Sequence, residues 1–358
     1  MSNSRRNFLS LAGLSALGLG LAGSKSSGKD FVEPTKLPDI GILNQYHPKI
    51  IPYSLKAGST VAITAPASPT SMYEIRNGKN YFQKMGCKVI VGKTITGQKN
   101  EHRYLSAPDD VRAEEFMSFI SNKEVDAIVC GRGGYGSMRI LPHLDFDEIA
   151  ANPKIIMGFS DITALLNAIY RKTGIVTYHG PVASMDFETF AGSSLQTILF
   201  DSKVHPQNYI SQSNAITINS GIASGELVGG NLTILTSMLG TEYEMDTSGR
   251  ILFIEDVSEH AYQIDRMLTQ LLLAGKIQSA SAVIFGVFKN LNFRRPFFPN
   301  RGYTILEVIK DLFTPTHVPT IVGFPFGHIS GKVTLPIGIN AEINTEKKAL
   351  RFTESTVL

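Results

Sequence analysis

The chain has no tryptophan, only two cysteines and no block of like charge within its 358 residues. Cys87 and Cys130 are too few for a disulfide framework, and neither belongs to a Cys-x-x-Cys pair or a Cys/His cluster that would predict a zinc site. Both lie in apolar stretches, so we expect two small buried side chains. With 34 Lys and Arg against 31 Asp and Glu, the net charge of +3 gives no reason to expect a nucleic-acid partner.

The first 30 residues have the composition of a targeting segment. Arg5 and Arg6, in Ser-Arg-Arg-Asn-Phe-Leu, resemble a twin-arginine export motif, and an uncharged stretch follows from Phe8 to Ala22. This stretch is too short and too rich in glycine for a confident membrane span, and it is typical of a signal-peptide core. We expect a signal peptide over residues 1–22, export to the periplasm and no stable membrane insertion after processing. A retained anchor is the alternative.

After a linker and lead-in expected over residues 23–50, short apolar runs alternate with helical patterns up to residue 205. The runs are apolar on both faces, which predicts a parallel sheet covered by helices, and hence a doubly wound α/β domain. The expected strands lie within 59–68, 87–93, 125–130, 153–158 and 174–180, and the expected helices within 70–86 and 107–124.

Residues 206–358 contain a glycine-rich stretch at 221–245 and more strand-like patterns, and we expect them to form a second, β-rich α/β domain. Apolar runs at 250–257 and 281–288 predict strands. Residues 259–276 place apolar side chains on one helical face. The alternating pattern over 332–355 predicts antiparallel strands.

A glycine-rich stretch, Cys-Gly-Arg-Gly-Gly-Tyr-Gly, begins at Cys130 directly after an expected strand. Backbone N–H groups of such a loop can face an anion. The glycine spacing does not match a dinucleotide-binding motif, and no Gly-Lys-Ser/Thr follows that would predict a P-loop. A tight turn without further function is the alternative.

Ser160 stands between an expected strand that ends at Gly158 and a helical pattern that begins at once. Serine is a common helix N-cap, although Thr163 does not complete a capping box. Glycine two positions before the serine also favours a sharp strand-to-helix turn that exposes a nucleophilic hydroxyl. The match to that motif is partial, because Ile162 replaces its second glycine.

A serine nucleophile needs a histidine base and an acid that orients the base. His179 ends an expected strand, and His328 lies in a glycine-rich loop before another. Glu255 and Asp256 end a third strand, which is a functional position in many α/β proteins. Spacing alone does not choose between the two histidines or between the two acids.

Five separated stretches together resemble the LD-carboxypeptidases, a family of serine peptidases that includes the microcin C resistance peptidases. The resemblance covers about residues 50–345 and implies Ser160 as nucleophile, Glu255 as acid and His328 as base. It further implies an oxyanion hole formed by the N–H groups of Asp161 and Gly134. The stretches, in the family's order, are residues 62–68, 131–181, 225–241, 249–275 and 324–338.

The resemblance implies hydrolysis of the L,D-peptide bond to the terminal D-alanine of murein tetrapeptides, with no cofactor or metal, by a homodimer. Arg132 is a candidate partner for the substrate carboxylate, with pinning of its own loop as the alternative. Two other functions stay open at this point. One is hydrolysis of a microcin-like peptidyl-nucleotide, which an aromatic-rich loop at the site would favour and which the aromatic and arginine residues of 292–303 leave open. The other is a non-catalytic peptidoglycan-binding protein.

Overall fold

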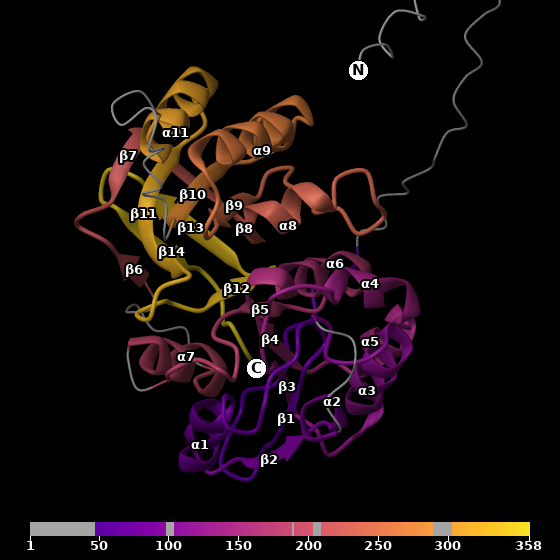
Figure 1. Cartoon of the computed structure of the whole chain (residues 1–358). Coiled ribbons are helices and arrows are strands. Elements are labelled where there is room, and N and C mark those ends of the chain that lie inside the picture. Colours follow the sequence, from indigo (N-terminus) through magenta and orange to yellow (C-terminus); the bar gives the residue numbers. More distant parts are fainter. Residues whose placement is uncertain (1–46, 98–103, 188–189, 203–208, 289–302) are drawn as a thin grey trace, which may run out of the picture. The chain divides into compact units, whose positions relative to one another are not determined.

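The computed structural model describes residues 47–97, 104–187, 190–202, 209–288 and 303–358. The expected signal peptide and most of the lead-in therefore lie outside the described residues. The described residues from 47 to 358 form one compact unit, and within it the chain builds two sheets (Figure 1). Along the described ranges, no helix combines the length and the apolar character needed to cross a membrane.

The first sheet confirms the expected parallel α/β arrangement. Five of its strands run parallel in the order β2-β1-β3-β4-β5, and β12 pairs antiparallel with β5 at the edge. This is a doubly wound order, in which ligands bind outside the carboxyl ends of the strands. The strands are β1 (Thr60–Thr64), β2 (Lys88–Val91), β3 (Ala127–Cys130), β4 (Ile155–Gly158), β5 (Thr177–His179) and β12 (Leu335–Ile337).

Helices flank this sheet on both sides, as a sheet that is apolar on both faces requires. In Figure 1, α1 and α7 lie to one side and α2, α3 and α5 to the other. The helices are α1 (Arg76–Lys84), α2 (Lys93–Thr96), α3 (Asp109–Ser121), α4 (Ser137–Ile140), α5 (Phe146–Ala151), α6 (Thr163–Thr173) and α7 (Phe190–Phe200). Short 3₁₀ turns, η1 (Leu141–His143) and η2 (Ser160–Ile162), precede α5 and α6.

The second sheet is mixed, which confirms the expected β-rich α/β architecture. Strands β8 to β11 are parallel neighbours, and antiparallel strands extend the sheet on both sides in the order β6-β14-β13-β8-β9-β10-β11-β7. The strands are β6 (Tyr209–Ser211), β7 (Ile216–Asn219), β8 (Ile222–Asn231), β9 (Ile251–Glu255), β10 (Ala282–Val287), β11 (Thr320–Gly327), β13 (Asn340–Asn344) and β14 (Ala349–Phe352).

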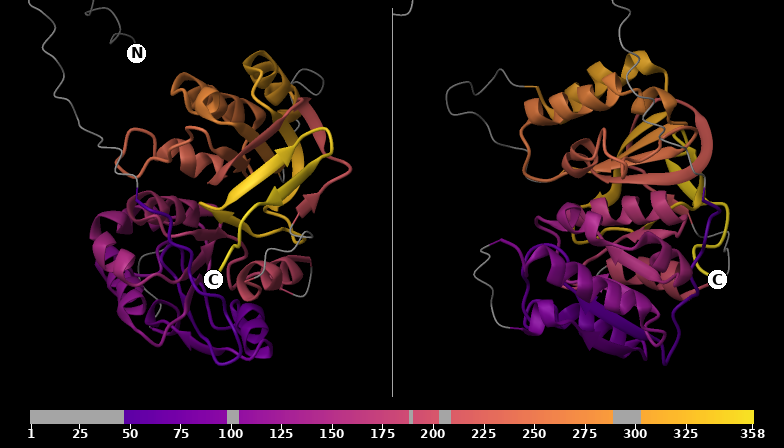
Figure 2. Two further views of the ribbon diagram at one scale, coloured as in Figure 1. Left: turned by 180° about the vertical axis from the view of Figure 1, so that it is seen from behind. Right: turned by 90° about the vertical axis from the view of Figure 1, so that its right-hand side faces the viewer.

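Helices cover one face of this second sheet, and Figure 2 shows them on its outer side. They are α8 (Leu232–Ser237), α9 (Ala261–Leu273), α10 (Lys276–Ser279) and α11 (Ile305–Phe313), followed by η3 (Thr314–Thr316). The expected apolar face of α9 is buried through Ile264, Met267, Leu268 and Leu271. The amphipathic pattern at 259–276 therefore correctly predicted how this helix packs.

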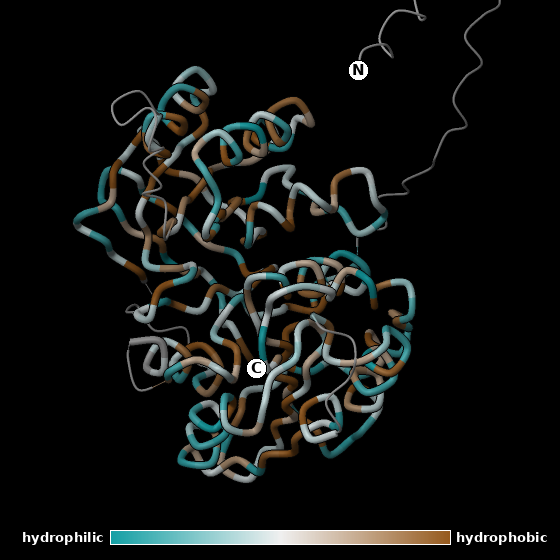
Figure 3. The backbone as a smooth tube through the Cα atoms, in the orientation of Figure 1, coloured by the Kyte–Doolittle hydropathy of each residue, from teal (hydrophilic) through white to brown (hydrophobic). Residues whose placement is uncertain are grey.

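The core is divided by the alternation of side chains along β9. Leu252 and Ile254 pack beneath the helices, whereas Ile251 and Phe253 belong to a larger cluster that also contains the first sheet's strands. The larger cluster is thus a hydrophobic core shared by the two sheets, and Figure 3 shows in brown the hydrophobic residues along the strands. Cys87 and Cys130 are both buried, as expected, and burial raises the pKa of the Cys87 thiol to about 11.

Strand β12 connects the two halves of the fold. It follows β11 of the second sheet, yet it pairs with β5 of the first, with Leu335 opposite His179. The loop between β11 and β12, residues 328–334, therefore passes from one sheet to the other at the carboxyl ends of β5 and β11. Gly158, at the end of β4, is the other neighbour of His179.

Candidate active site

Ser160 occupies a strained turn between β4 and α6. Its φ of +63° lies in the left-handed region, which is unfavourable for any residue with a side chain. A Cβ on Gly158 would lie only 2.7 Å from the Cγ2 atom of Ile162, so the turn requires glycine there. The N-cap interpretation is wrong, because an N-cap residue is extended and the Ser160 side chain makes no capping hydrogen bond.

The glycine-rich loop after β3 packs directly on this turn. A Cβ on Gly133 would approach the Ser160 Cβ atom to 2.9 Å and its Oγ atom to 3.2 Å. Gly134 has a φ of +96° and lies against Ser68, whose Oγ atom accepts a hydrogen bond from the Tyr135 N–H at 3.1 Å. Glycine is therefore required at 133 for close approach and at 134 for backbone conformation.

Asp161 ties the loop to the turn. Its buried carboxylate accepts hydrogen bonds from the N–H groups of Gly136, at 3.2 Å, and Ser137, at 2.8 Å. The Ser137 hydroxyl donates in return to the Asp161 carbonyl oxygen at 2.5 Å. The side chain of Asp161 thus has a structural role. The oxyanion role expected for its N–H, and for that of Gly134, stays a prediction.

Glu255 and His328 meet at the carboxyl ends of β9 and β11. The Nδ1 atom of His328 lies 2.7 Å from Oε2 of Glu255, which is fully buried. A Cβ on Gly327, whose φ is +111°, would lie 3.2 Å from the same Oε2 atom, so glycine at 327 leaves room for the pair. With Nδ1 engaged by the acid, the Nε2 atom of His328 is the one left to act as a base.

Asp256, the other acid left open by the sequence, has a different role. Its carboxylate accepts hydrogen bonds from the N–H groups of Val257, at 2.7 Å, and Thr233, at 2.9 Å, and from the Asn231 side chain at 3.1 Å. Burial raises the pKa of Asp256, although these hydrogen bonds oppose the rise. Asp256 therefore orders the start of α8, and Glu255 is the acid that contacts a histidine.

The charge on Glu255 depends on its neighbours. Burial alone would raise its pKa, but the hydrogen bond from His328 and the nearby His179 and Lys332 hold that pKa below its ordinary value. Burial lowers the pKa of His179 to about 4. Glu255 is thus an ionised acid, and His179 is a neutral imidazole at the end of β5.

Phe159 and Lys332 also lie beside these residues, and no sequence pattern had indicated either of them. The Phe159 ring lies 4.8 Å from the His328 ring, centre to centre, and the Lys332 ammonium lies 3.3 Å from the centre of the same Phe159 ring. Because Phe159 directly precedes Ser160, the turn and the proposed base are close. Within the described ranges, no hydrogen bond joins Ser160 Oγ to either histidine.

Arg112 is a further residue that sequence patterns did not single out. It is fully buried in α3, and its guanidinium donates hydrogen bonds to the carbonyl oxygens of Pro66, Ala107 and Gly136 and pairs with Asp109. It therefore fastens the glycine-rich loop to the loop after β1. A charged residue on an otherwise apolar helix face was the only sequence indication.

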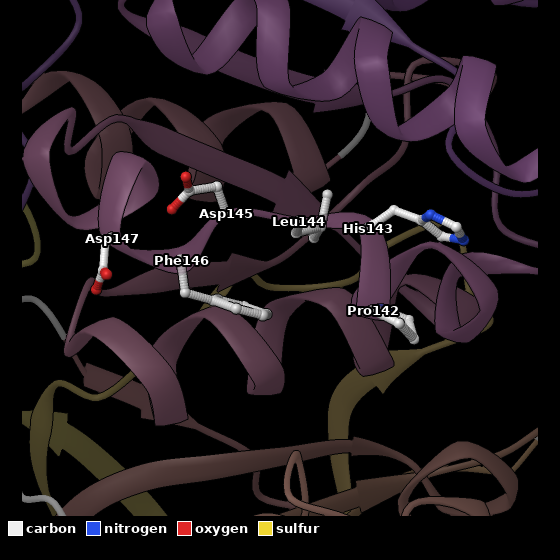
Figure 4. A pocket seen from close by; sticks show the side chains of 6 residues that line it. All are labelled: Pro142, His143, Leu144, Asp145, Phe146 and Asp147. Carbon is white, nitrogen blue, oxygen red and sulfur yellow. The ribbon is translucent and has the colours of Figure 1, made fainter.

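Arg132, the candidate for binding a substrate carboxylate, has a half-exposed side chain whose guanidinium lies 3.6 Å from Glu74. A hollow elsewhere on the surface is lined by residues 142–147 and contains none of the expected site residues (Figure 4). Asp145 in this hollow caps α5 by accepting from the Glu148 N–H. Over the described ranges, no three His, Cys, Asp or Glu side chains are arranged to hold a metal ion.

Comparisons with known proteins match one family along most of the chain. Residues 61–180 match the model of the LD-carboxypeptidase N-terminal domain, and residues 224–343 match that of the LD-carboxypeptidase C-terminal domain. The chain is 37% identical over 303 residues to a probable murein peptide carboxypeptidase of Bacillus subtilis, an alignment that covers 83% of this chain and 92% of that protein.

Solved structures show the same similarity. The structure of MccF with glutamyl sulfamoyl guanosine superimposes with a TM-score of 0.77 at 27% identity, covering 86% of this chain and 99% of that one. The muramoyltetrapeptide carboxypeptidase of Oxalobacter formigenes gives a TM-score of 0.72 at 28% identity, covering 83% of this chain and 99% of that one.

Proposed function

The chain belongs to the LD-carboxypeptidase family of serine-type hydrolases, and from this membership we propose that it removes the terminal D-alanine from murein tetrapeptides. One observation carries the proposal: the buried carboxylate of Glu255 is hydrogen-bonded to Nδ1 of His328 beside the strained turn of Ser160. The similarity to a probable murein peptide carboxypeptidase supports the substrate class.

In the proposed mechanism, the Ser160 hydroxyl attacks the carbonyl carbon of the L,D-peptide bond, and Nε2 of His328 accepts its proton. Glu255 holds the imidazole tautomer and stabilises the imidazolium that forms. His328 then returns the proton to the amino group of the leaving D-alanine. Water attacks the acyl-enzyme in the second half of the reaction, with His328 again as base.

The tetrahedral intermediates carry a negative oxygen that needs hydrogen-bond donors. The N–H groups of Asp161 and Gly134 are the proposed donors, since the turn and the glycine-rich loop pack against each other through Gly133. Each such donor is expected to contribute roughly 10²–10³ in rate.

The test uses a purified murein tetrapeptide, with the products identified by mass spectrometry. The wild-type protein should release D-alanine and leave the tripeptide, whereas Ser160→Ala and Glu255→Gln should lose turnover and keep the fold. Asp256→Asn serves as the matched acid control and should retain turnover, although with reduced stability. Full turnover by Ser160→Ala would refute the nucleophile, and absence of wild-type turnover would refute the substrate.

Hydrolysis of a microcin-like peptidyl-nucleotide is the second candidate, favoured by the similarity to MccF. The stretch 292–303, whose aromatic and arginine residues left this activity open, lies outside the described residues except for Tyr303, which is exposed. An aminoacyl sulfamoyl adenosine offered beside the tetrapeptide decides between the two. Turnover of either compound excludes a purely binding role.

Two further properties complete the proposal. The twin-arginine-like segment supports export to the periplasm, so a reporter fused to residues 1–30 should be exported, and Arg5→Lys with Arg6→Lys should block that export.

The family resemblance supports a homodimer, which sedimentation of the purified protein should detect. A monomer at micromolar concentration would contradict it.

A further inference from the structure

Two buried polar atoms face each other behind the Glu255–His328 pair. The Oε1 atom of Glu255 and the Nε2 atom of His179 are 3.9 Å apart, and neither has a hydrogen-bond partner among the described residues. Both side chains are almost completely excluded from solvent. Buried polar atoms without partners are uncommon and costly, so two of them in apposition call for an explanation.

We propose that His179 is a positioning residue for Glu255: its Nε2–H holds Oε1, so that Oε2 stays directed at Nδ1 of His328. The inference rests on the proposed triad and adds a second imidazole to its acid. A shift of about 1 Å would bring the two atoms to the usual length of an N–H···O bond. The carboxylate would then have one imidazole on each oxygen.

The place of His179 in the fold fits this role. In β5 it pairs with Gly158, which precedes the Ser160 turn, and with Leu335 of β12, which follows the His328 loop. Its ring lies edge-on to Phe253, at 5.3 Å between centres, and to Phe159, at 6.1 Å. The imidazole is thus fixed on two sides between the strand of the proposed nucleophile and the loop of the proposed base.

His179 cannot replace His328 as the base. It is 1% exposed, so a substrate has no access to it, and burial keeps it neutral by lowering its pKa to about 4. The ionisable groups around it are Glu255 on β9 and His328 and Lys332 on the loop before β12. Glu255 favours protonation of His179, whereas His328 and Lys332 oppose it. A neutral imidazole that carries its proton on Nε2 can donate a hydrogen bond to the second oxygen of the ionised Glu255.

The test compares His179→Gln, which can keep an N–H near the position of Nε2, with His179→Leu, which cannot. We expect His179→Leu to lower kcat by about 10-fold or more while KM changes little, because His179 acts on the acid and does not touch the substrate. Without this hydrogen bond from His179, the Glu255 carboxylate interacts more strongly with the protonated imidazole of His328. The acid limb of the pH–kcat/KM profile should therefore move to higher pH.

His179→Gln should restore both kcat and the profile, and the exposed-site control His143→Gln should change neither. The proposal is overturned if His179→Leu keeps wild-type kcat and pH profile, or if a well-folded His179→Gln is as impaired as His179→Leu. Should His179→Leu not fold, imidazole ¹⁵N NMR of the wild-type protein decides, because the proposal requires a neutral His179 protonated on Nε2. A bare Nε2 overturns it.

Failure of this inference is distinguishable from failure of the proposed function. If Ser160→Ala and Glu255→Gln are inactive but His179→Leu behaves as wild type, only the role of His179 is lost. If Ser160→Ala and Glu255→Gln retain turnover, the triad itself is wrong, whatever His179 does.

Discussion

At the scale of single residues, Ser160 combines a chemically useful side chain with an unfavourable backbone conformation. Left-handed φ values cost a residue with a Cβ about 1 kcal/mol or more, and such strain persists where the surrounding fold enforces it. Here β4, the glycine-rich loop and α6 enforce it together. Ser258, His317 and Lys348 also have positive φ, so the strain at Ser160 supports the proposed nucleophile only together with the glycine-rich loop that packs on this turn.

This strain predicts an unusual order of stabilities. Ser160→Gly should be more stable than Ser160→Ala by about 1 kcal/mol, because glycine adopts positive φ without penalty. At the control position Ser118, within helix α3, the order should reverse, since alanine is the better helix former. Urea denaturation of the four variants measures both differences. Equal stabilities at position 160 would show that the turn is not strained.

The buried His179 predicts a pH dependence of stability. Its folded pKa of about 4 lies below the unfolded value near 6.5, so between these values the unfolded chain binds more protons. The free energy of unfolding should therefore fall as the pH drops from about 6.5 to 4, by at most about 3 kcal/mol from this residue. Glu255, whose pKa is lowered, acts in the same direction at lower pH.

Denaturation midpoints at pH 7 and pH 5 measure this effect. His179→Gln should lose less stability than the wild type over that interval, because its side chain does not titrate. His143→Gln, on the surface, should keep the wild-type slope. An unchanged slope in His179→Gln would mean that His179 is not buried as a neutral group.

At the scale of elements, the turn before α6 and the loop before α4 form one unit, joined by the Asp161 carboxylate. Asp161→Ala should lower stability by about 1–3 kcal/mol, because two buried N–H groups lose their acceptor, and should lower kcat by displacing the loop from Ser160. Asp161→Asn, which keeps one oxygen, should lose less of both.

Asp145→Ala is the control for that experiment, because Asp145 also accepts a backbone hydrogen bond at a helix start but lies in the hollow of residues 142–147. It should lose about 0.5–2 kcal/mol of stability with kcat unchanged. Wild-type kcat and stability in Asp161→Ala would show that its carboxylate does not hold the loop.

Local sequence patterns predicted those elements whose packing follows from the pattern of their own side chains. The doubly apolar runs gave the parallel strands, and the face of α9 gave its packing. The crossing of β12 was not predictable, because Leu335–Ile337 alternates like its antiparallel neighbours and nothing local indicates which sheet it joins. Whether Glu255 or Asp256 contacts His328 depends on which side of β9 faces that histidine. The register of β9 against β10, and of β10 against β11, decides this only in the folded chain.

At the scale of the whole described unit, the shared core and β12 make the two halves mutually dependent. A fragment of residues 47–205 would lack the edge strand on β5 and the buried Leu335 and Ile337. We expect it to keep secondary structure but to lose the cooperative urea transition and the near-ultraviolet circular dichroism of the full chain. Joining residues 331–358 to this fragment through a flexible linker should restore part of both. A cooperative transition in the bare fragment would contradict this dependence.

The position of β12 in the chain also determines when the first sheet can be completed during synthesis. The ribosome makes β5 well before its partner β12, so the first sheet lacks its edge strand until β6 to β11 of the second sheet have been made. His328 emerges only just before that strand. The proposed base is therefore absent until the edge strand of the first sheet is about to form, and chains that end before it carry Ser160 without His328.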